Sequence, residues 1–200
     1  MSQISKNAGS GGGGTGNVTG PGSSVNNDIV IFNGTTGQLI ADSGVPITSV
    51  IAPEGFAAYM SASAANVTGD GTTVPLVFNT TMNNTGNYNP ANGVYTAPST
   101  GIYLFTTTVA LTGGNASSTN YIIIWDGNGY SARAFQDNPV VPSGGNTNIY
   151  SACIVIPMNA GDGMKVSANV SGAAKNITVF GGAPSSLAVT STFAGRKISN

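Results

Sequence analysis

The chain has 200 residues, of which 6 are Lys or Arg and 7 are Asp or Glu, giving a formal net charge of -1. Charged residues make up 6% of the chain, against about 25% in an ordinary soluble domain. Nucleic-acid phosphates are bound by clustered Lys and Arg, so this composition argues against nucleic-acid binding. Histidine is absent, which excludes Ser-His-Asp, Cys-His and zinc-His centres.

The first 24 residues have the composition of a linker. They contain GSGGGGTG and GPGSS and almost no apolar side chain. Such a segment buries too little surface to offset the entropy lost on ordering, so residues 1–24 are predicted to be a flexible tether. They also lack the apolar stretch of a secretory signal, and no window of the chain approaches about 18 consecutive apolar residues. We therefore expect neither an export signal nor membrane contact.

Residues 25–54 are expected to form a short β-stem. Two β-rich runs, Asp28–Phe32 and Gln38–Ala41, flank a segment that contains Asn-Gly, the strongest local signal for a hairpin. A lone two-stranded hairpin is only marginally stable in water. It would need neighbours, and identical copies from other chains are the simplest source.

From residue 55 to residue 200, short β-rich runs alternate with turn signals. β-Branched and aromatic residues fill the runs, and Gly-Asp-Gly, Asp-Gly-Asn-Gly and Pro-Ser-Gly-Gly separate several of them. No window shows a convincing helical period. The pattern predicts an all-β sandwich or jelly roll. The expected strands lie in residues 55–63, 73–80, 92–98, 101–113, 120–130, 148–158, 164–170, 175–182 and 186–195.

The stretch GIYLFTTTVAL, residues 101–111, predicts how one strand is buried. The face of this strand that points away from the expected core carries Ile102 and Leu104, and further along the strand it becomes polar. A strand that is apolar on both faces at one end needs a cover there, either a loop or another subunit. The face expected to pack into the core contains four apolar residues and one threonine: Tyr103, Phe105, Thr107, Val109 and Leu111.

Trp125 and Tyr130 lie on either side of a predicted turn in WDGNGY. Aromatic side chains at loop tips stack on sugars or anchor protein contacts, so both residues are candidates for ligand contact. The alternative is that both fill the edge of the core. Cys153 is the only cysteine and lies in the apolar run SACIVIPM, where we expect a small buried side chain.

Carboxylates are the remaining candidates for chemistry. A glycosidase needs two of them in one cleft, but most of those present lie beside Gly or Asn in predicted turns, where Asp caps its own backbone. Asp70 and Asp126 have Gly-rich neighbours that would suit calcium, although no EF-hand spacing is present. We therefore predict no catalytic, cofactor-binding or metal residues, with calcium the one candidate ligand. The carboxylates are Asp28, Asp42, Glu54, Asp70, Asp126, Asp137 and Asp162.

Two runs and a set of spaced positions in the segment from Gly55 to Asn200 are distinctive: YNPANGVYTAPSTGIYLF, the closing TSTFAG (residues 190–195), and a signature that runs from Phe78 to Phe105. Through them the segment resembles the C1q and tumour-necrosis-factor-like jelly rolls, the first run being similar to the second-strand region of that family and TSTFAG to its last strand. The gap between Asn84 and the next aromatic, Tyr88, is one residue shorter than in the family signature, and Thr107 stands where an aromatic is common in the family. The resemblance implies a ten-stranded jelly roll that assembles as a trimer around a three-fold axis. The signature positions are Phe78, Asn84, Tyr88, Tyr95, Gly101, Tyr103 and Phe105.

The preceding segment, Gly16 to Val45, resembles a segment common in bacteriophage and other viral fibre proteins. Together the two resemblances imply an appendage on the virion surface, with a tether or virion anchor (1–24), a short β-stem (25–54) and a C1q-like head (55–200). We expect a non-enzymatic homotrimeric surface fibre or capsid-decoration protein. Its tether would bind other virion proteins, and its head would contact host-surface glycans.

Two alternatives have the same fold. One is a tail-associated receptor-binding adhesin. The other is a secreted C1q-like ligand, which the absence of collagen-like Gly-x-y repeats and of a signal peptide makes less attractive.

Overall fold

The computed structural model describes residues 28–33, 39–46, 55–127, 130–138, 147–183 and 190–199. Every regular element in these residues is a β-strand, so the prediction of an all-β fold is confirmed. No helix long and apolar enough to cross a membrane occurs in these ranges. Internal contacts divide the chain into two units, Met1–Pro53 and Glu54–Asn200. The tether predicted for residues 1–24 lies outside the described residues.

In its described residues the first unit has one antiparallel pair of strands, β1 (Asp28–Asn33) and β2 (Leu39–Pro46). The pairing agrees with the sequence prediction, but β2 extends beyond the predicted Gln38–Ala41 to Pro46. Val30 lies opposite Asp42, and Ile31 lies opposite Ala41. The register shifts between Asp28 and Val30, which marks a bulge or irregularity near the start of β1. Residues 34–38, where the sequence predicts the turn between the two strands, lie outside the described residues.

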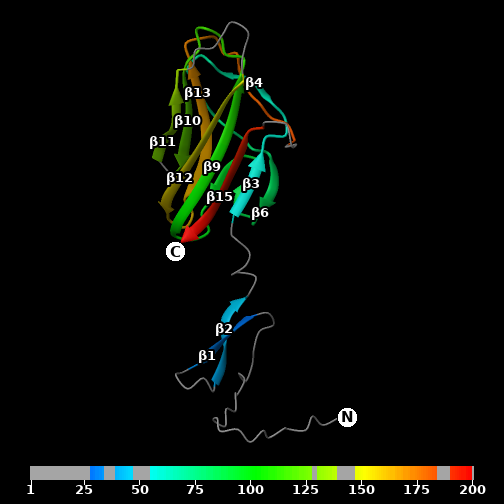
Figure 1. Cartoon of the computed structure of the whole chain (residues 1–200), viewed down its shortest axis with the longest axis vertical. Coiled ribbons are helices and arrows are strands. Elements are labelled where there is room, and N and C mark those ends of the chain that lie inside the picture. Colours follow the sequence, from blue (N-terminus) through cyan, green and yellow to red (C-terminus); the bar gives the residue numbers. More distant parts are fainter. Residues whose placement is uncertain are drawn as a thin grey trace, which may run out of the picture. The chain divides into compact units, whose positions relative to one another are not determined.

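The second unit, which we call the head, is built from two sheets, and the first is organised around β9 (Figure 1). Strand β12 pairs with β9 from Gly101 opposite Met158 to Leu111 opposite Asn148 without a break. On the other edge of β9, β15 covers one end and β14 the other, and β15 in turn pairs with β3. The strands of this sheet are β3 (Gly55–Tyr59), β4 (Ala64–Thr68), β6 (Thr80–Asn84), β9 (Gly101–Thr112), β12 (Asn148–Met158), β14 (Ile177–Val179) and β15 (Thr192–Ser199).

The second sheet has the order β11-β10-β13-β8-β7, and β5 adds to β13. Strands β10 and β13 form its centre, and β11 forms one edge. Its strands are β5 (Thr73–Pro75), β7 (Tyr88–Asn89), β8 (Val94–Thr96), β10 (Thr119–Gly127), β11 (Tyr130–Asp137) and β13 (Gly163–Ser171).

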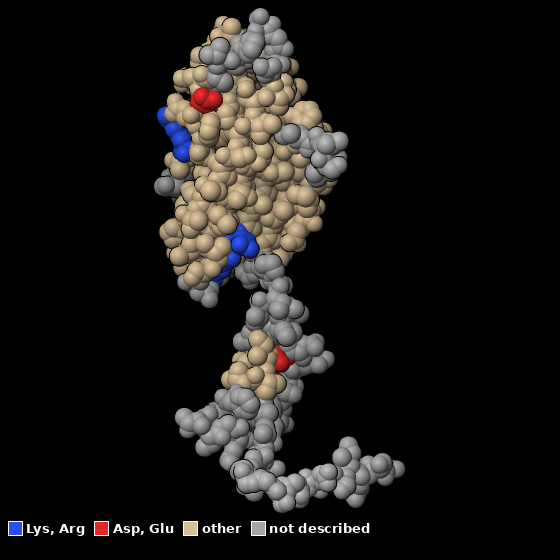
Figure 2. All heavy atoms as spheres, viewed as in Figure 1, with Lys and Arg blue, Asp and Glu red and all other residues tan. Residues whose placement is uncertain are grey.

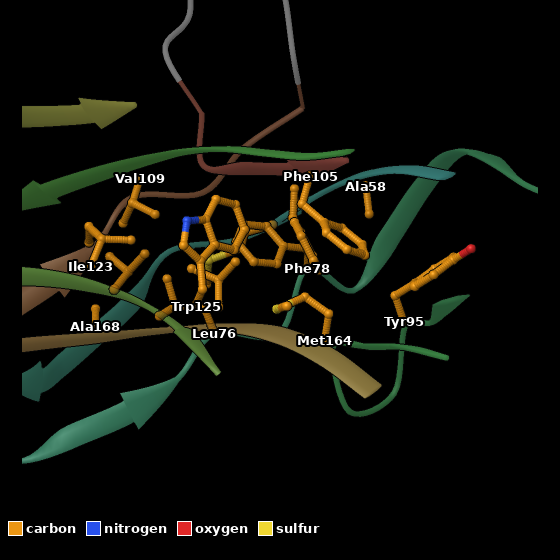
Figure 3. Close-up of a cluster of buried hydrophobic side chains, with 14 of the residues drawn as sticks. Ala58, Leu76, Phe78, Tyr95, Phe105, Val109, Ile123, Trp125, Met164 and Ala168 are labelled. Carbon is orange, nitrogen blue, oxygen red and sulfur yellow. The ribbon is translucent and has the colours of Figure 1, made fainter. Parts of the chain in front are cut away.

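The hydrophobic core lies between the two sheets. Figure 3 shows the indole of Trp125, from β10, inside the cluster with Phe78 and Phe105 close by. Its ring centroid is 6.4 Å from that of Phe105 and 6.1 Å from that of Phe193, so β10 packs across the core onto β9 and β15. Gly195 allows this packing, because a Cβ there would collide with the ring of Phe105. The core thus fastens the two sheets face to face.

Four strands of the second unit were not predicted from the sequence: β4, β6, β7 and β11. Each is very short or has few large apolar residues, and pairing with a neighbouring strand holds it in place. Conversely, the predicted strand 73–80 is interrupted: Thr73–Pro75 forms β5 and Thr80 begins β6. Leu76 and Phe78 reach the core from the irregular backbone between them. The apolar runs of the sequence therefore predicted which residues are buried better than they predicted where strands begin and end.

Candidate assembly surface

The inward face of β9 is buried as predicted. Four of the five residues are fully buried, and Thr107, the polar member, is 4% exposed. The Thr107 hydroxyl donates a hydrogen bond to the carbonyl oxygen of Thr192 at 2.8 Å, so its burial leaves no unpaired donor. The four apolar residues are Tyr103, Phe105, Val109 and Leu111.

The outward face of β9 continues across β12, β15 and β3, and we call the outward side chains of these four strands the β9 face. The full register between β9 and β12 places Val155 opposite Leu104 and Pro157 opposite Ile102. Val155 is 59% exposed and Ile102 is 38% exposed. The apolar end predicted from Ile102 and Leu104 is therefore real, and β12 enlarges it.

A second apolar group, which the sequence did not reveal, lies at the other end of β9. Ile149 lies opposite Ala110, and the backbone N–H of Phe180 donates to the Ala110 carbonyl at 2.8 Å. Ile149 is 49% exposed and Phe180 is 39% exposed, while Ala110 is fully buried. Pairing across sequence distance brings these residues together, so no local pattern marks them.

Small polar side chains separate the two apolar ends. The hydroxyls of Thr108 and Ser151 lie 3.0 Å apart and form a hydrogen bond across β9 and β12. Cys153 lies opposite Thr106 and is exposed, so the prediction that this thiol is buried was wrong. The run SACIVIPM is apolar on both faces of β12, and the alternation places Ile154 toward the core and Cys153 toward the β9 face.

The β9 face carries almost no charge. Arg196, on β15 opposite Leu104, is the one charged residue in the described residues of this face. Figure 2 shows the surface over β12, β9 and β15 without acidic residues over its centre, and with basic residues only at its margins. In the described residues β12 pairs with β9 alone, and no Lys, Arg, Asp or Glu lies in β12 to guard its free edge. Both the face and the edge are suited to contact with protein.

Trp125 does not reach the surface. Its side chain is 1% exposed and packs against Phe105 and Phe193, so the proposed ligand contact was wrong for this residue, and the alternative of a core position applies. The alternation of β10 explains this, because Tyr121, Ile123 and Trp125 all point inward. The backbone of Tyr130 pairs with Gly127. Its side chain lies outside the described residues, and its ligand contact stays a prediction.

The signature aromatics belong to one stack in the core. Phe56, which the sequence had not singled out, stacks on Tyr88 at a centroid distance of 4.4 Å and on Tyr95 at 5.1 Å. The Tyr88 hydroxyl donates to the Phe78 carbonyl at 2.9 Å, and burial raises the pKa of this phenol well above its usual range. Tyr103 and Phe105 stack at 6.3 Å beside Tyr95.

The two non-aromatic signature positions have backbone roles. The Asn84 side-chain amide donates to the Tyr88 carbonyl at 2.8 Å, and its oxygen accepts from the N–H of Gly86 at 3.0 Å. At Gly101 a Cβ would collide with the Lys197 side chain and the Ser199 carbonyl. The signature therefore specifies packing and turn geometry rather than a binding site.

The two calcium candidates make ordinary protein contacts. Asp70 accepts from the backbone N–H of Thr72 at 3.0 Å, and hydrogen bonds to Thr72 lower the pKa of its carboxyl. Asp126 forms an ion pair with Lys165 at 3.3 Å and accepts from the Ser131 hydroxyl. In the described ranges no three Asp, Glu or Cys side chains gather as they would around a metal ion.

Two facing sheets with an aromatic stack at one end define a jelly-roll sandwich of the C1q and tumour-necrosis-factor type. Residues 58–195 match the C1q domain family model, and the chain belongs to the C1q domain family. No curated protein matches the sequence.

Among solved structures, 202 chains match. The globular domain of zebrafish complement 1qA protein has 16% identity and a TM-score of 0.50, covering 73% of this chain and 97% of that one. Eiger TNF from S. frugiperda has 12% identity and a TM-score of 0.48, covering 73% of this chain and 93% of that one. Murine APRIL at pH 5.0 has 14% identity and a TM-score of 0.43, covering 73% and 99%. At these identities the zebrafish likeness shows the fold alone.

Proposed function

We propose that this protein is a non-enzymatic homotrimeric surface fibre or capsid-decoration protein of a virus, which displays its C1q head outward. The observation that carries the proposal is the β9 face, where exposed Val155 and Ile149 lie on a sheet surface with almost no charge. Such a face is suited to burial against other copies of the chain.

Assembly through this face has a favourable energy balance. Fully burying one Val, Ile or Phe side chain contributes about 1.5–3 kcal/mol. Ile102, Ile149 and Val155 on this face all retain substantial exposure in the single chain, as does Phe180 beside it. Since Arg196 is the one charge on the described face, little desolvation of charge opposes the gain. A trimer would also cover the edge of β12.

The viral part of the proposal rests on the segment from Gly16 to Val45, which resembles segments of bacteriophage fibre proteins. In this proposal the N-terminal residues bind a virion protein, and the hairpin of β1 and β2 separates that anchor from the head. Three heads on each fibre, repeated over a particle, would make weak contacts to host-surface glycans effective through avidity.

Cys153 provides a direct test of assembly, because it is the only thiol and lies on the β9 face. The purified chain would be measured by light scattering behind size exclusion, and its thiol titrated with a maleimide in native buffer and in denaturant. We expect the mass of three chains, with a thiol that reacts slowly when native and rapidly when unfolded. A single-chain mass with a fast native thiol would overturn the trimer.

A matched control moves the thiol to the second sheet. Ser131 is exposed on β11, so the double variant Cys153→Ser, Ser131→Cys should keep the trimeric mass and react rapidly when native. Slow labelling of this control would mean that thiol reactivity does not report on the β9 face.

The virion role needs a separate test on particles. Antibodies raised against the head would be used for immunogold labelling of virus from the source culture. Gold on the capsid supports decoration, and gold on the tail supports the receptor-binding adhesin. If particles carry no gold and the antibodies detect the protein only in the particle-free culture medium, a secreted ligand is favoured and both viral roles are contradicted. A glycan array probed with the assembled protein then tests host attachment.

A further inference from the structure

The β1–β2 hairpin exposes apolar side chains on both of its faces. Val30 and Ile31 are consecutive residues of β1, so they point to opposite faces. Val30 is 64% exposed, the highest value among the large apolar side chains of the described residues, and Ile31 is 46% exposed. A hairpin that only separates two parts of a chain needs no apolar face, and this one has two.

The hairpin also lacks the charged residues that would prevent its exposed edges and faces from contacting other chains. Residues 28–46 contain no Lys or Arg, and Asp28 and Asp42 are the only charged residues. The Asp42 carboxylate accepts a hydrogen bond from the N–H of Gly44 at 2.8 Å, so it serves the local backbone. The usual defence of an exposed strand edge is a Lys side chain, and none is present.

The hairpin is also too small to be stable alone, because a two-stranded sheet is marginal in water. Strand β2 ends at Pro46 and β3 begins at Gly55, which leaves eight residues, 47–54, between hairpin and head. Eight extended residues span at most roughly 26–29 Å. Heads that are joined would therefore hold their hairpins at an effective concentration on the order of millimolar.

Symmetry sets how such hairpins would meet. In a ring of three copies every contact is heterologous, so each copy must offer two different patches, one to each neighbour. A hairpin with two distinct apolar faces meets this requirement. A two-fold pair would use one patch twice and leave the other face exposed.

We propose that the hairpins of neighbouring copies form a second, separate interface, in which the Val30 face of one hairpin packs on the Ile31 face of the next around the ring. The partner is the same hairpin of the other copies. This inference rests on the trimer of the proposed function and adds an interface that does not involve the β9 face.

Disulfide trapping tests this arrangement in the full-length chain. In a Cys153→Ser background, the double variant Val30→Cys, Ile31→Cys has one thiol on each face of the hairpin. Oxidation should link each chain to both neighbours and give a three-chain band on a non-reducing gel. The single variants Val30→Cys and Ile31→Cys should remain single chains, because like faces do not meet. Dimers from either single variant, or single chains from the double variant, would overturn the proposal.

Hydrogen exchange provides a second readout that does not need new thiols. In the full-length protein, amides of β1 and β2 should exchange at least about tenfold more slowly than in the double variant Val30→Thr, Ile31→Thr, which keeps β-branched residues. The mass by light scattering should not change, because the heads still assemble. Equal exchange in the two proteins would contradict the hairpin interface. A single-chain mass of the unmodified protein would instead contradict the proposed function.

Discussion

The two sheets of the head have different outer faces. The second sheet carries Asp126, Arg133 and Lys165, with Lys165 paired to Asp126 at 3.3 Å and Arg133 donating to Gln136. The β9 face of the first sheet carries Arg196 and otherwise apolar or hydroxyl side chains. Only 6% of the residues in the chain are charged, and several of the charged residues in the head lie on this second sheet. This difference is what the proposed assembly requires, in which the second sheet stays in water and other copies of the chain cover the first.

The largest effect is expected from placing a charge on the β9 face. In Val155→Arg, a guanidinium would have to be buried without a partner, so assembly should be lost and the mass should fall from three chains to one. Circular dichroism should still report a folded head, because Val155 is exposed in the single chain. Ser131→Arg on the second sheet is the matched control and should remain trimeric. A trimeric Val155→Arg protein would contradict the assignment of the two faces.

Unlike the outer faces, the inner faces of the two sheets form one shared core, so truncating a large core side chain should lower the free energy of unfolding. Trp125→Ala removes a side chain that is 1% exposed and contacts Phe105 and Phe193, so unfolding free energy should fall by about 3–5 kcal/mol. Trp125→Phe should cost less because it leaves a smaller cavity. Denaturant unfolding of the Val155→Arg monomer would measure both changes without a contribution from assembly. A loss below about 1 kcal/mol for Trp125→Ala would contradict its central position.

The ion pair on the second sheet should matter little. Lys165 and Asp126 are each 33% exposed, so water screens their attraction, and Lys165→Ala should cost at most about 1 kcal/mol. The mass of the assembly should stay at three chains in both low and high salt, because the β9 face does not depend on ion pairs. Dissociation at high salt would mean that charges hold the subunits together.

The smallest effect concerns pH and the hairpin. Desolvation, and then the nearby Asp42 carboxyl, raise the pKa of Asp28. A raised pKa means that the folded hairpin favours the protonated form, so its stability is greatest at acidic pH and is lost as pH rises through the pKa of Asp28. Asp28→Asn should remove this dependence. The measurement is the protection factor of the β1 amides at pH 4 and pH 7, that is, their exchange rate corrected for intrinsic exchange at each pH. If the variant kept the pH dependence of the unmodified protein, the assignment of that dependence to Asp28 would be contradicted.

Several parts of the fold were predictable from the sequence because local chemistry determines them. Alternation in residues 101–111 identified which face of β9 is buried, including Thr107, whose hydroxyl finds the Thr192 carbonyl. The hairpin of β1 and β2 was predicted from two apolar runs around Asn-Gly. The resemblance to the family signature implied a jelly roll, and the structure shows that the signature aromatics Tyr95, Tyr103 and Phe105 pack together in its core.

Other features depend on strand pairing, which the sequence does not display. Cys153 and Trp125 both lie in apolar runs, but the thiol points outward and the indole inward, because only the sheets decide which face is covered. Ile149 and Phe180 form one exposed group through separate contacts with Ala110. Strand β11 contains Arg133 and Gln136 and was missed, since its partner β10 supplies the burial.

Strand β15 lies between β9 and β3 in the middle of the first sheet, as Figure 1 shows in red between green and cyan. Phe56 pairs with Gly195, so the sheet joins residues from opposite ends of the head. During synthesis on the ribosome the first sheet cannot close until residues 192–199 have emerged. A truncated chain leaves the edges of β3 and β9 open and lacks part of the β9 face. Assembly through that face would therefore select for chains whose translation has passed this point.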